Sequence, residues 1–454
     1  MTDNITRRDF LKKTGTAALA LGTASLPGCG SGSGSKPETA SGNGEMEYRT
    51  SPRNGEKVSL LGFGCMRWPM VKVDGKDVID QDAVNEMVDY AYKNGVNYYD
   101  TSPAYLQGQS EAAAGTALCR YPRESYYIAT KLSNFQTYTH EASMKMYRDS
   151  LENLRTDYFD YYLLHSIGRG GMELFEDRYV KNGMMDFLLK EREAGRIRNL
   201  GFSFHGRKDA FDQFMELHDK YHWDFVQIEL NYVDWEHAKS PRNVNADYLY
   251  EELAKRNIPA TIMEPLLGGR LANLPESIAA RMKEREPEMS VASWALRFAG
   301  TFPGVLTVLS GMTSMDPLVE NIRTFSGFKP LTDEETEFLK RIADLMENYP
   351  VVPCTDCKYC MPCPYGIDIP GIFKHYNDHV NAGEIAQSKE QEDYRKLKRA
   401  YLVSYDRAIG TVRQADHCIG CHQCESHCPQ SIRIPDELHK IGNYIERLRR
   451  DALK

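Results

Sequence analysis

The chain has no long apolar run, no run of basic residues and, over most of its length, few cysteines. Its 454 residues include 64 acidic and 56 basic side chains, for a net charge of -8. An acidic balance without a Lys/Arg cluster argues against nucleic acid as a partner. The lack of a long apolar segment argues against a membrane-spanning helix in the body of the chain. The length predicts one large domain and one small domain.

The cysteines that are present gather near the end of the chain. Eight of the eleven lie in two runs, Cys354-x2-Cys357-x2-Cys360-x2-Cys363-Pro364 and Cys418-x2-Cys421-x2-Cys424-x3-Cys428-Pro429. Three thiolates separated by two-residue gaps hold three irons of a [4Fe-4S] cluster, and a fourth thiolate followed by proline comes from elsewhere. The spacing therefore predicts iron-sulfur ligation.

The last cysteine of each run is expected to complete the other cluster, as in two-cluster ferredoxins. The first cysteine set is then Cys354, Cys357, Cys360 and Cys428, and the second cysteine set is Cys363, Cys418, Cys421 and Cys424. The first run departs from the ferredoxin pattern, because two residues and not three precede its last cysteine. Two alternatives stay open: a pair of zinc sites, and four disulfides in an exported protein.

Residues 1–29 have the pattern of an export signal. Arg7 and Arg8 lie in the segment TRRDFLK, and a mildly apolar stretch at residues 15–26 is too short to span a bilayer. The pattern resembles twin-arginine signals, and that resemblance implies export in the folded state. Such a route suits a chain whose clusters are inserted in the reducing cytoplasm.

A lipid anchor is predicted at the end of this signal. Leu26-Pro27-Gly28-Cys29 resembles a bacterial lipobox, in which Cys29 becomes the lipidated first residue. The Gly/Ser-rich residues 30–45 would form a flexible tether. The alternative is a simple cleaved signal in which Cys29 is incidental. Both interpretations predict a periplasmic or cell-envelope protein, and the first attaches it to the membrane through lipid alone.

Short apolar segments then alternate with amphipathic ones up to about residue 348. In residues 82–94, for example, Val84, Met87, Val88 and Ala91 share one helical face. Eight strand-helix units predict an α/β fold, the (β/α)8 TIM barrel, whose active sites lie at the carboxyl ends of the strands. The predicted strands are residues 59–63, 96–100, 126–131, 159–165, 197–203, 225–230, 259–263 and 305–310.

Polar residues stand at the ends of seven of these eight predicted strands. They are Asp100, Lys131, His165, Ser203, Asn231, Glu264 and Ser310. Any one of them alone is better explained as an ordinary strand-end or helix-capping residue. Their recurrence favours a site at this end of the barrel.

Residues 46–348 resemble the aldo/keto reductase family. The resemblance rests on the order of short motifs along the strands: LGFG at 61–64, YDTSPAY at 99–105, ATK at 129–131, LLH at 163–165, GFS at 201–203, EPL at 264–266 and SGM at 310–312. It implies that Asp100, Tyr105, Lys131 and His165 form the catalytic tetrad of this family.

The chemistry of carbonyl reduction explains this set of residue types. Hydride delivery leaves negative charge on the carbonyl oxygen, so a proton donor must stand within hydrogen-bond reach of it. Tyr105 is the predicted donor, and the ammonium of Lys131 is expected to lower the pKa of its phenol. Asp100 would hold Lys131 in place, and His165, as the neutral imidazole, would orient the carbonyl oxygen.

The resemblance also implies a nicotinamide cofactor, NADP(H) or NAD(H). The predicted cofactor-binding residues are Ser203, Gln227, Ser310, Glu320 and Asn321. Other positions depart from the family's pattern: Phe204 replaces an Asn, Met263 replaces a stacking Tyr, and Gly311 and Pro317 replace basic residues near the 2'-phosphate. Without a fixed cation for that phosphate, the choice between the two cofactors stays open.

Residues 350–454 are predicted to form a small ferredoxin-like domain extended by helices. The segment IDIP at 367–370 repeats as IRIP at 432–435, which supports two related halves. Residues 391–405 are helical in composition, and a closing helix over residues 436–453 is expected to pack on the barrel. The barrel domain is assigned to residues 46–349.

The predicted function is an oxidoreductase that interconverts a carbonyl and an alcohol on a small substrate such as a sugar. A hydride carries two electrons and a cluster carries one, and no motif for a flavin, the usual mediator, is evident. Either a redox partner protein exchanges electrons through the clusters, or the clusters serve structure. Two other functions stay open: an electron-transfer protein with a non-catalytic barrel, and a surface lipoprotein that binds saccharide.

Overall fold

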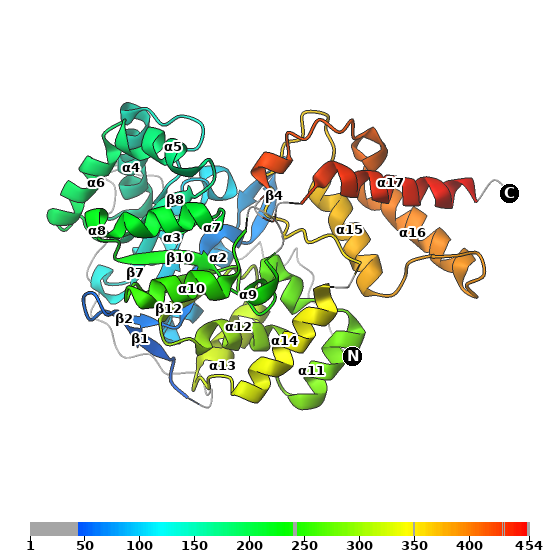
Figure 1. Cartoon of the computed structure of the whole chain (residues 1–454), viewed down its shortest axis with the longest axis horizontal. Coiled ribbons are helices and arrows are strands. Elements are labelled where there is room, and N and C mark those ends of the chain that lie inside the picture. Colours follow the sequence, from blue (N-terminus) through cyan, green and yellow to red (C-terminus); the bar gives the residue numbers. More distant parts are fainter. Residues whose placement is uncertain (1–43, 239–242, 348–349, 429, 431, 452–454) are drawn as a thin grey trace, which may run out of the picture. The chain divides into compact units, whose positions relative to one another are not determined.

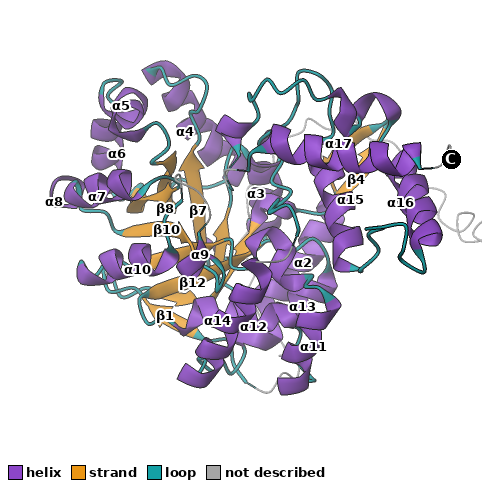
Figure 2. Cartoon of the chain, turned by 45° about the vertical axis from the view of Figure 1, so that its right-hand side comes forward, coloured by secondary structure: helices purple, strands orange, loops and turns teal. Residues whose placement is uncertain are grey.

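Eight parallel strands close into a barrel in the order β10-β11-β12-β3-β6-β7-β8-β9, and helices surround them (Figures 1 and 2). The computed structural model describes residues 44–238, 243–347, 350–428, 430 and 432–451. All eight predicted strands are present with small shifts at their ends, and the (β/α)8 prediction is confirmed. The barrel strands are β3 (Leu61–Gly64), β6 (Tyr98–Asp100), β7 (Tyr127–Leu132), β8 (Phe159–Ile167), β9 (Ile197–Phe204), β10 (Phe225–Glu229), β11 (Ala260–Met263) and β12 (Val305–Ser310).

The barrel's helices turn one apolar face inward. In α2 the buried residues include Val84, Met87 and Val88, as predicted, and Asp80 caps the helix by accepting a hydrogen bond from the Ala83 amide. The α-helices from the first barrel strand to the cysteine runs are α2 (Gln81–Lys93), α3 (Ser110–Leu118), α4 (His140–Leu154), α5 (Gly171–Phe175), α6 (Met184–Glu193), α7 (Lys208–Glu216), α8 (His218–Tyr221), α9 (Asp234–His237), α10 (Ala246–Lys255), α11 (Glu276–Arg285), α12 (Val291–Thr301), α13 (Met315–Phe325) and α14 (Asp333–Glu347).

Two short antiparallel hairpins were not predicted. β1 (Tyr48–Thr50) pairs with β2 (Lys57–Ser59), and β4 (Met70–Val73) pairs with β5 (Lys76–Ile79). Each strand has only three or four residues, too short for an alternating pattern to stand out from its surroundings. The first hairpin lies against β12.

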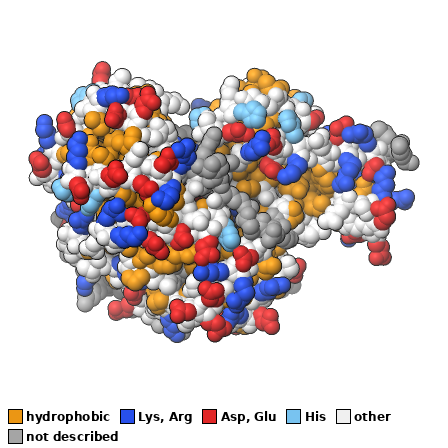
Figure 3. Space-filling model, viewed as in Figure 1, with side chains coloured by type: hydrophobic (Ala, Val, Ile, Leu, Met, Phe, Trp, Pro, Cys, Tyr) orange, Lys and Arg blue, Asp and Glu red, His pale blue; other side chains and the backbone are white. Residues whose placement is uncertain are grey.

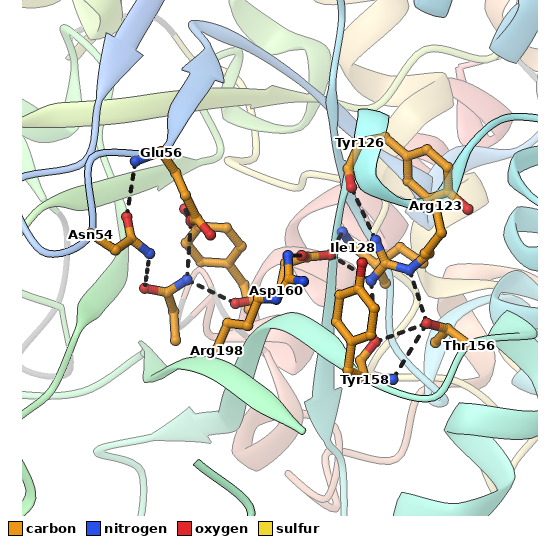
Figure 4. Close-up of polar contacts among 11 residues, drawn as sticks. Asn54, Glu56, Arg123, Tyr126, Ile128, Thr156, Tyr158, Asp160 and Arg198 are labelled. Atoms are coloured by element: carbon orange, nitrogen blue, oxygen red, sulfur yellow. Dashed lines mark hydrogen bonds and ion pairs between the residues drawn. The ribbon is translucent and has the colours of Figure 1, made fainter. Parts of the chain in front are cut away.

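A buried ion-pair network joins the amino ends of β7, β8 and β9. Figure 4 shows Asp160 between two arginines. Arg123 approaches Oδ2 of Asp160 at 2.6 Å, and the Ile128 amide donates to the same oxygen at 2.9 Å. Arg198 approaches Oδ1 at 3.0 Å. Burial raises the pKa of Asp160, and the two arginines oppose that shift. This network occupies the opposite end of the strands from the predicted active site.

The cysteine-rich part has an apolar core of its own. α15 (Ile369–Asn381), α16 (Tyr394–Ala408) and α17 (Ile434–Arg450) contact one another. The IDIP and IRIP repeats open α15 and α17 in the same way, with a proline in the first turn. The expectation that the closing helix packs on the barrel is wrong, because the buried face of α17 belongs to this second core, with Leu438, Ile441 and Leu448.

The predicted signal, with Arg7, Arg8 and Cys29, and most of the predicted tether lie outside the described residues. Within the described part of the chain, none of the helices combines the length and the apolar character that a membrane span requires. On the face drawn in Figure 3, acidic and basic side chains are interspersed. This face therefore presents no basic surface of the kind that binds nucleic acid.

Asp160→Ala should destabilise the barrel strongly. The substitution leaves two arginines without their shared carboxylate and costs about 3–5 kcal/mol of unfolding free energy, the usual cost of breaking a buried pair. Asp149→Ala is the matched control, because Asp149 pairs with Lys145 on the surface of α4. It should cost less than about 1 kcal/mol. Urea denaturation of anaerobic protein measures both, and equal losses would contradict the structural role of Asp160.

Candidate active site

A buried ion pair lies at the carboxyl ends of β6 and β7. Asp100 ends β6, and its carboxylate accepts a hydrogen bond from Lys131 Nζ at 2.5 Å and one from Gln227 Nε2 at 3.1 Å. Lys131 also donates to the Thr101 carbonyl at 2.9 Å. The side chain of Lys131 is 0% exposed and that of Asp100 is 4% exposed. These bonds hold the ammonium in one orientation inside the barrel mouth.

Tyr105 lies directly beside this ion pair. The Lys131 ammonium is 4.8 Å from the centroid of the Tyr105 ring. The chain turns sharply just after the tyrosine, since Leu106 and Gln107 both have positive φ. Such strained backbone persists only where surrounding contacts hold it, and it is common at functional sites.

His165 approaches Tyr105 from β8. The two rings meet edge to face, with 6.0 Å between their centroids. Nδ1 of His165 is 2.5 Å from Ser133 Oγ and 3.3 Å from Ser102 Oγ, which leaves Nε2 for a ligand. Burial lowers the pKa of His165 well below its ordinary value, and the charge of Lys131 adds to that effect. The imidazole is therefore neutral at physiological pH, as predicted.

The net shift of the Tyr105 pKa is upward, opposite to the expected lowering. Burial raises the pKa of the Tyr105 phenol well above its ordinary value, and the negative charge of Asp100 raises it further. The phenol therefore keeps its proton at neutral pH, which is the form that a proton donor requires.

Asp100, Tyr105 and His165 open into one cavity of about 120 Å³ at the barrel mouth. The cavity is lined by Gly64, Met66, Arg67, Asp100, Tyr105, His165, Ser203, His205, Gln227, Glu229, Met263, Glu264, Leu309, Gly311, Cys357 and Tyr359. We call it the tetrad cavity. Its lining combines apolar side chains with a few convergent polar groups, as small-molecule sites do.

Three carboxylates border the tetrad cavity. Besides Asp100, these are Glu229, which lies 3.1 Å from His205 Nδ1, and Glu264. Burial raises the pKa of Glu264 to about 7, and the charge of Glu229 adds to the shift. Oε2 of Glu264 is buried with no hydrogen-bond partner among the described residues. A buried acceptor without a partner suits a ligand that brings hydroxyl donors.

The predicted cofactor-binding residues divide between two places. Ser203 and Gln227 line the tetrad cavity, although Ser203 Oγ accepts from the Ser166 amide and Gln227 donates to Asp100. Ser310 lines the adjoining cavity and accepts a hydrogen bond from Asn321 at 2.9 Å.

The structure also places Glu320, and two positions at which the sequence departs from the family pattern, Phe204 and Met263. Glu320 is exposed on α13. Phe204 is buried and meets Phe211 edge to face, whereas Met263 lines the tetrad cavity. Ser203 and Gln227 supply polar groups, and Met263 an apolar surface, of the kinds that a nicotinamide needs. The residues present therefore fit the nicotinamide end of the cofactor.

The first cysteine set lines a single cavity. Cys354, Cys357, Cys360 and Cys428 surround it together with apolar side chains such as Phe373 and Ile432. Cys428 comes from the second run, so the structure brings cysteines of both runs to this cavity. Four thiols around one apolar cavity fit a [4Fe-4S] cluster, whose ligands are thiolates.

The second cysteine set also comes together. Burial raises the pKa of the Cys418 thiol, and the nearby thiols of Cys363 and Cys421 add to the effect. Cys424 is affected in the same way by Cys418 and Cys421. The described cysteines form no disulfide. Among the described residues, no group of three His, Cys, Asp or Glu side chains is placed to hold a single metal ion.

The family models settle what the geometry suggests. Residues 60–344 match the model of the aldo/keto reductase family, which covers more than half of the chain. The chain belongs to the aldo/keto reductase family. Residues 353–433 match the model of a 4Fe-4S dicluster domain, so this aldo/keto reductase carries an iron-sulfur domain after its barrel.

Individual relatives agree with this assignment. L-galactose dehydrogenase of Arabidopsis thaliana is 27% identical over 314 residues, which cover 64% of this chain and 92% of the relative. Among solved structures, the aldo-keto reductase AKR11C1 from Bacillus halodurans has a TM-score of 0.53 at 21% identity, covering 66% of this chain and 96% of its own. An aldo-keto reductase from Klebsiella pneumoniae in complex with NADPH has a TM-score of 0.52 at 21% identity, with the same coverage. The two structures share the barrel fold.

Several lining residues were missed from the sequence. His205 and Glu229 lie at or next to the ends of predicted strands, so their position was a usable signal. Arg67 follows β3 in a short 3-10 turn (Cys65–Arg67), and no motif marked it. In the sequence, almost 200 residues separate Cys357 and Tyr359 from His165, the nearest residue of the tetrad. Their place in the cavity depends on how the cysteine loop meets the barrel, which local patterns do not encode.

Proposed function

We propose that this aldo/keto reductase interconverts a carbonyl and an alcohol on a small polyhydroxylated substrate. One observation carries the proposal: Tyr105, His165 and Asp100 line one cavity, and the Lys131–Asp100 ion pair stands beside the phenol. A protonated phenol and a neutral imidazole at one cavity wall are the two groups that a carbonyl oxygen needs, one to donate a proton and one to orient it.

Each side chain of the tetrad then has a defined task. Tyr105 donates its proton to the oxygen during reduction and accepts it back during oxidation. His165 offers Nε2 to the same oxygen, because Nδ1 is engaged with Ser133. Lys131 stabilises the negative charge that develops near the phenol. Asp100 holds the Lys131 ammonium in position.

A nicotinamide cofactor, NADP(H) or NAD(H), would supply the hydride when bound. Ser203 and Gln227 would hold its carboxamide, and Ser310 borders the adjoining cavity along which the cofactor would extend. The NADPH in the Klebsiella pneumoniae structure supports this class of cofactor. Arg323 is exposed on α13, the helix after β12, and is a candidate partner for a 2'-phosphate.

A sugar-like substrate is supported from two sides. Glu229 and Glu264 border the cavity together with His205, so hydroxyl groups of a substrate would find acceptors there. The similarity to L-galactose dehydrogenase points to the same class. The chain would then bind a sugar or polyol by several hydrogen bonds and react at one carbon.

We further assign one [4Fe-4S] cluster to each cysteine set, for electron transfer with a redox partner protein. The assignment rests on the two groupings of thiols and on the dicluster match.

We also propose that the protein is located in the cell envelope, exported through a twin-arginine signal with Arg7 and Arg8 and anchored by a lipid on Cys29. Replacing both arginines by lysine should leave the precursor in the cytoplasm, and cell fractionation that finds normal export would contradict this route.

Tyr105→Phe should abolish most carbonyl reduction. Loss of a positioned proton donor lowers kcat by about 100-fold or more, while the iron content stays at the wild-type level. Steady-state assays with a panel of aldoses headed by L-galactose, in both directions and with both nicotinamide cofactors, measure the effect. Tyr90→Phe on α2 is the control and should match wild type. Turnover that survives in Tyr105→Phe would exclude the proposed mechanism.

Cys428→Ser tests the joining of the two runs. The wild-type chain should contain about eight irons and eight acid-labile sulfides, four of each per cluster. The variant should lose the cluster of the first cysteine set and retain about half of the iron. Cys119→Ser, which alters a cysteine in the barrel, should retain all of it. Zinc in place of iron, or full iron in Cys428→Ser, would refute the assignment.

A further inference from the structure

One cysteine separates the tetrad cavity from the cavity of the first cysteine set. Cys357 lines the tetrad cavity together with Tyr105 and His165. It also lines the cavity that Cys354, Cys360 and Cys428 surround. A single side chain is therefore shared by the candidate active site and the candidate cluster site.

Tyr359, two residues further along the same loop, is part of the same wall. It lines the tetrad cavity, and Tyr105 and Lys131 are close enough to act electrostatically on its phenol. The residue is still 38% exposed. The side chain of Tyr359 thus borders the cavity and also reaches the surface.

The loop that carries Cys357 and Tyr359 is fixed against the barrel. Arg67 donates to the Thr355 carbonyl at 2.7 Å. Gly268, which has a φ of +64°, approaches so closely that a Cβ built on it would lie 2.2 Å from Thr355 Cβ. A residue other than glycine would be strained there and would collide with the loop. These contacts hold the loop at the cavity mouth.

We propose that the loop of the first cysteine set is a wall of the substrate site, with the Tyr359 hydroxyl as a substrate-positioning group. The inference rests on the proposed function and narrows it. A polyhydroxylated substrate would lie between Tyr359 on one side and the acceptors Glu229 and Glu264 on the other, with its carbonyl toward Tyr105. The cluster of the first cysteine set is then the one coupled to the pocket.

This arrangement couples ligand binding in the tetrad cavity to the reduction of the cluster of the first cysteine set, and the coupling is reciprocal. Charge in the cavity acts on Cys357, and Glu264 is one of the groups that do so. If a ligand or a charge in the cavity changes the reduction potential of that cluster, the state of the cluster changes ligand affinity by the same factor. The second cysteine set has no wall in common with the tetrad cavity in the part of the chain that the structure describes, so its cluster should not respond.

The first test measures the two clusters without any substrate. Potentiometric titration followed by EPR of fully loaded protein gives one potential for each cluster. The titration is run at a pH well above 7, where the Glu264 carboxyl is ionised. Glu264→Gln then removes a negative charge near Cys357 and should raise one of the two potentials, because reduction adds negative charge to the cluster. Glu193→Gln, on the exposed end of α6, should raise neither. If both potentials of Glu264→Gln equal those of wild type, the proposal that Cys357 is shared by the substrate site and the cluster is wrong, whether or not the protein turns over. We call this sharing of Cys357 the shared wall.

The second test concerns Tyr359. Tyr359→Phe removes one hydrogen bond to substrate, so KM for the best aldose of the panel should rise about threefold to tenfold, with kcat nearly unchanged. Tyr365→Phe is the matched control, because Tyr365 also follows a cluster cysteine but is 49% exposed. An unchanged KM in Tyr359→Phe would overturn the positioning role.

The two failures are distinguishable. If no aldose or polyol is converted but Glu264→Gln still shifts one potential, the shared wall is supported and the proposed carbonyl chemistry is wrong. If turnover is normal and neither the potentials nor KM respond to these variants, the proposed function stands and the shared wall falls.

Discussion

The buried ion pair between Lys131 and Asp100 is the constraint on which the rest of this site depends. Two charges inside a barrel are costly unless each is well paired, and here each makes further hydrogen bonds, to Thr101 and Gln227. The eight parallel strands provide the frame, since they deliver all the strand-end side chains to one rim. A charged pair held in this way stabilises developing negative charge without reorganising during the reaction.

The two ends of the barrel have different roles. Ion pairs of Asp160 with Arg123 and Arg198 stabilise the amino ends of the strands, whereas the catalytic tetrad lies at the carboxyl ends. The iron-sulfur part has its own core and still contributes Cys357 and Tyr359 to the tetrad cavity. The two parts of the chain thus share one site although their cores are separate.

Much of the fold was predictable because its signals are local. The alternation of apolar and amphipathic segments located all eight strands, and the cysteine spacing predicted that Cys428 joins the first run. What failed depends on tertiary contacts. The side on which α17 packs and the direction of the Tyr105 pKa shift follow from burial, and Tyr359 enters the site through a contact between distant segments.

The most direct test of the account is a double-mutant cycle on Tyr105→Phe and Lys131→Met, read as kcat/KM for carbonyl reduction. If the ion pair acts through the phenol, the double variant should be hardly worse than Tyr105→Phe alone, because groups that act as a unit are strongly non-additive. Fully additive losses would show that Lys131 and Tyr105 act independently, and would contradict the central claim.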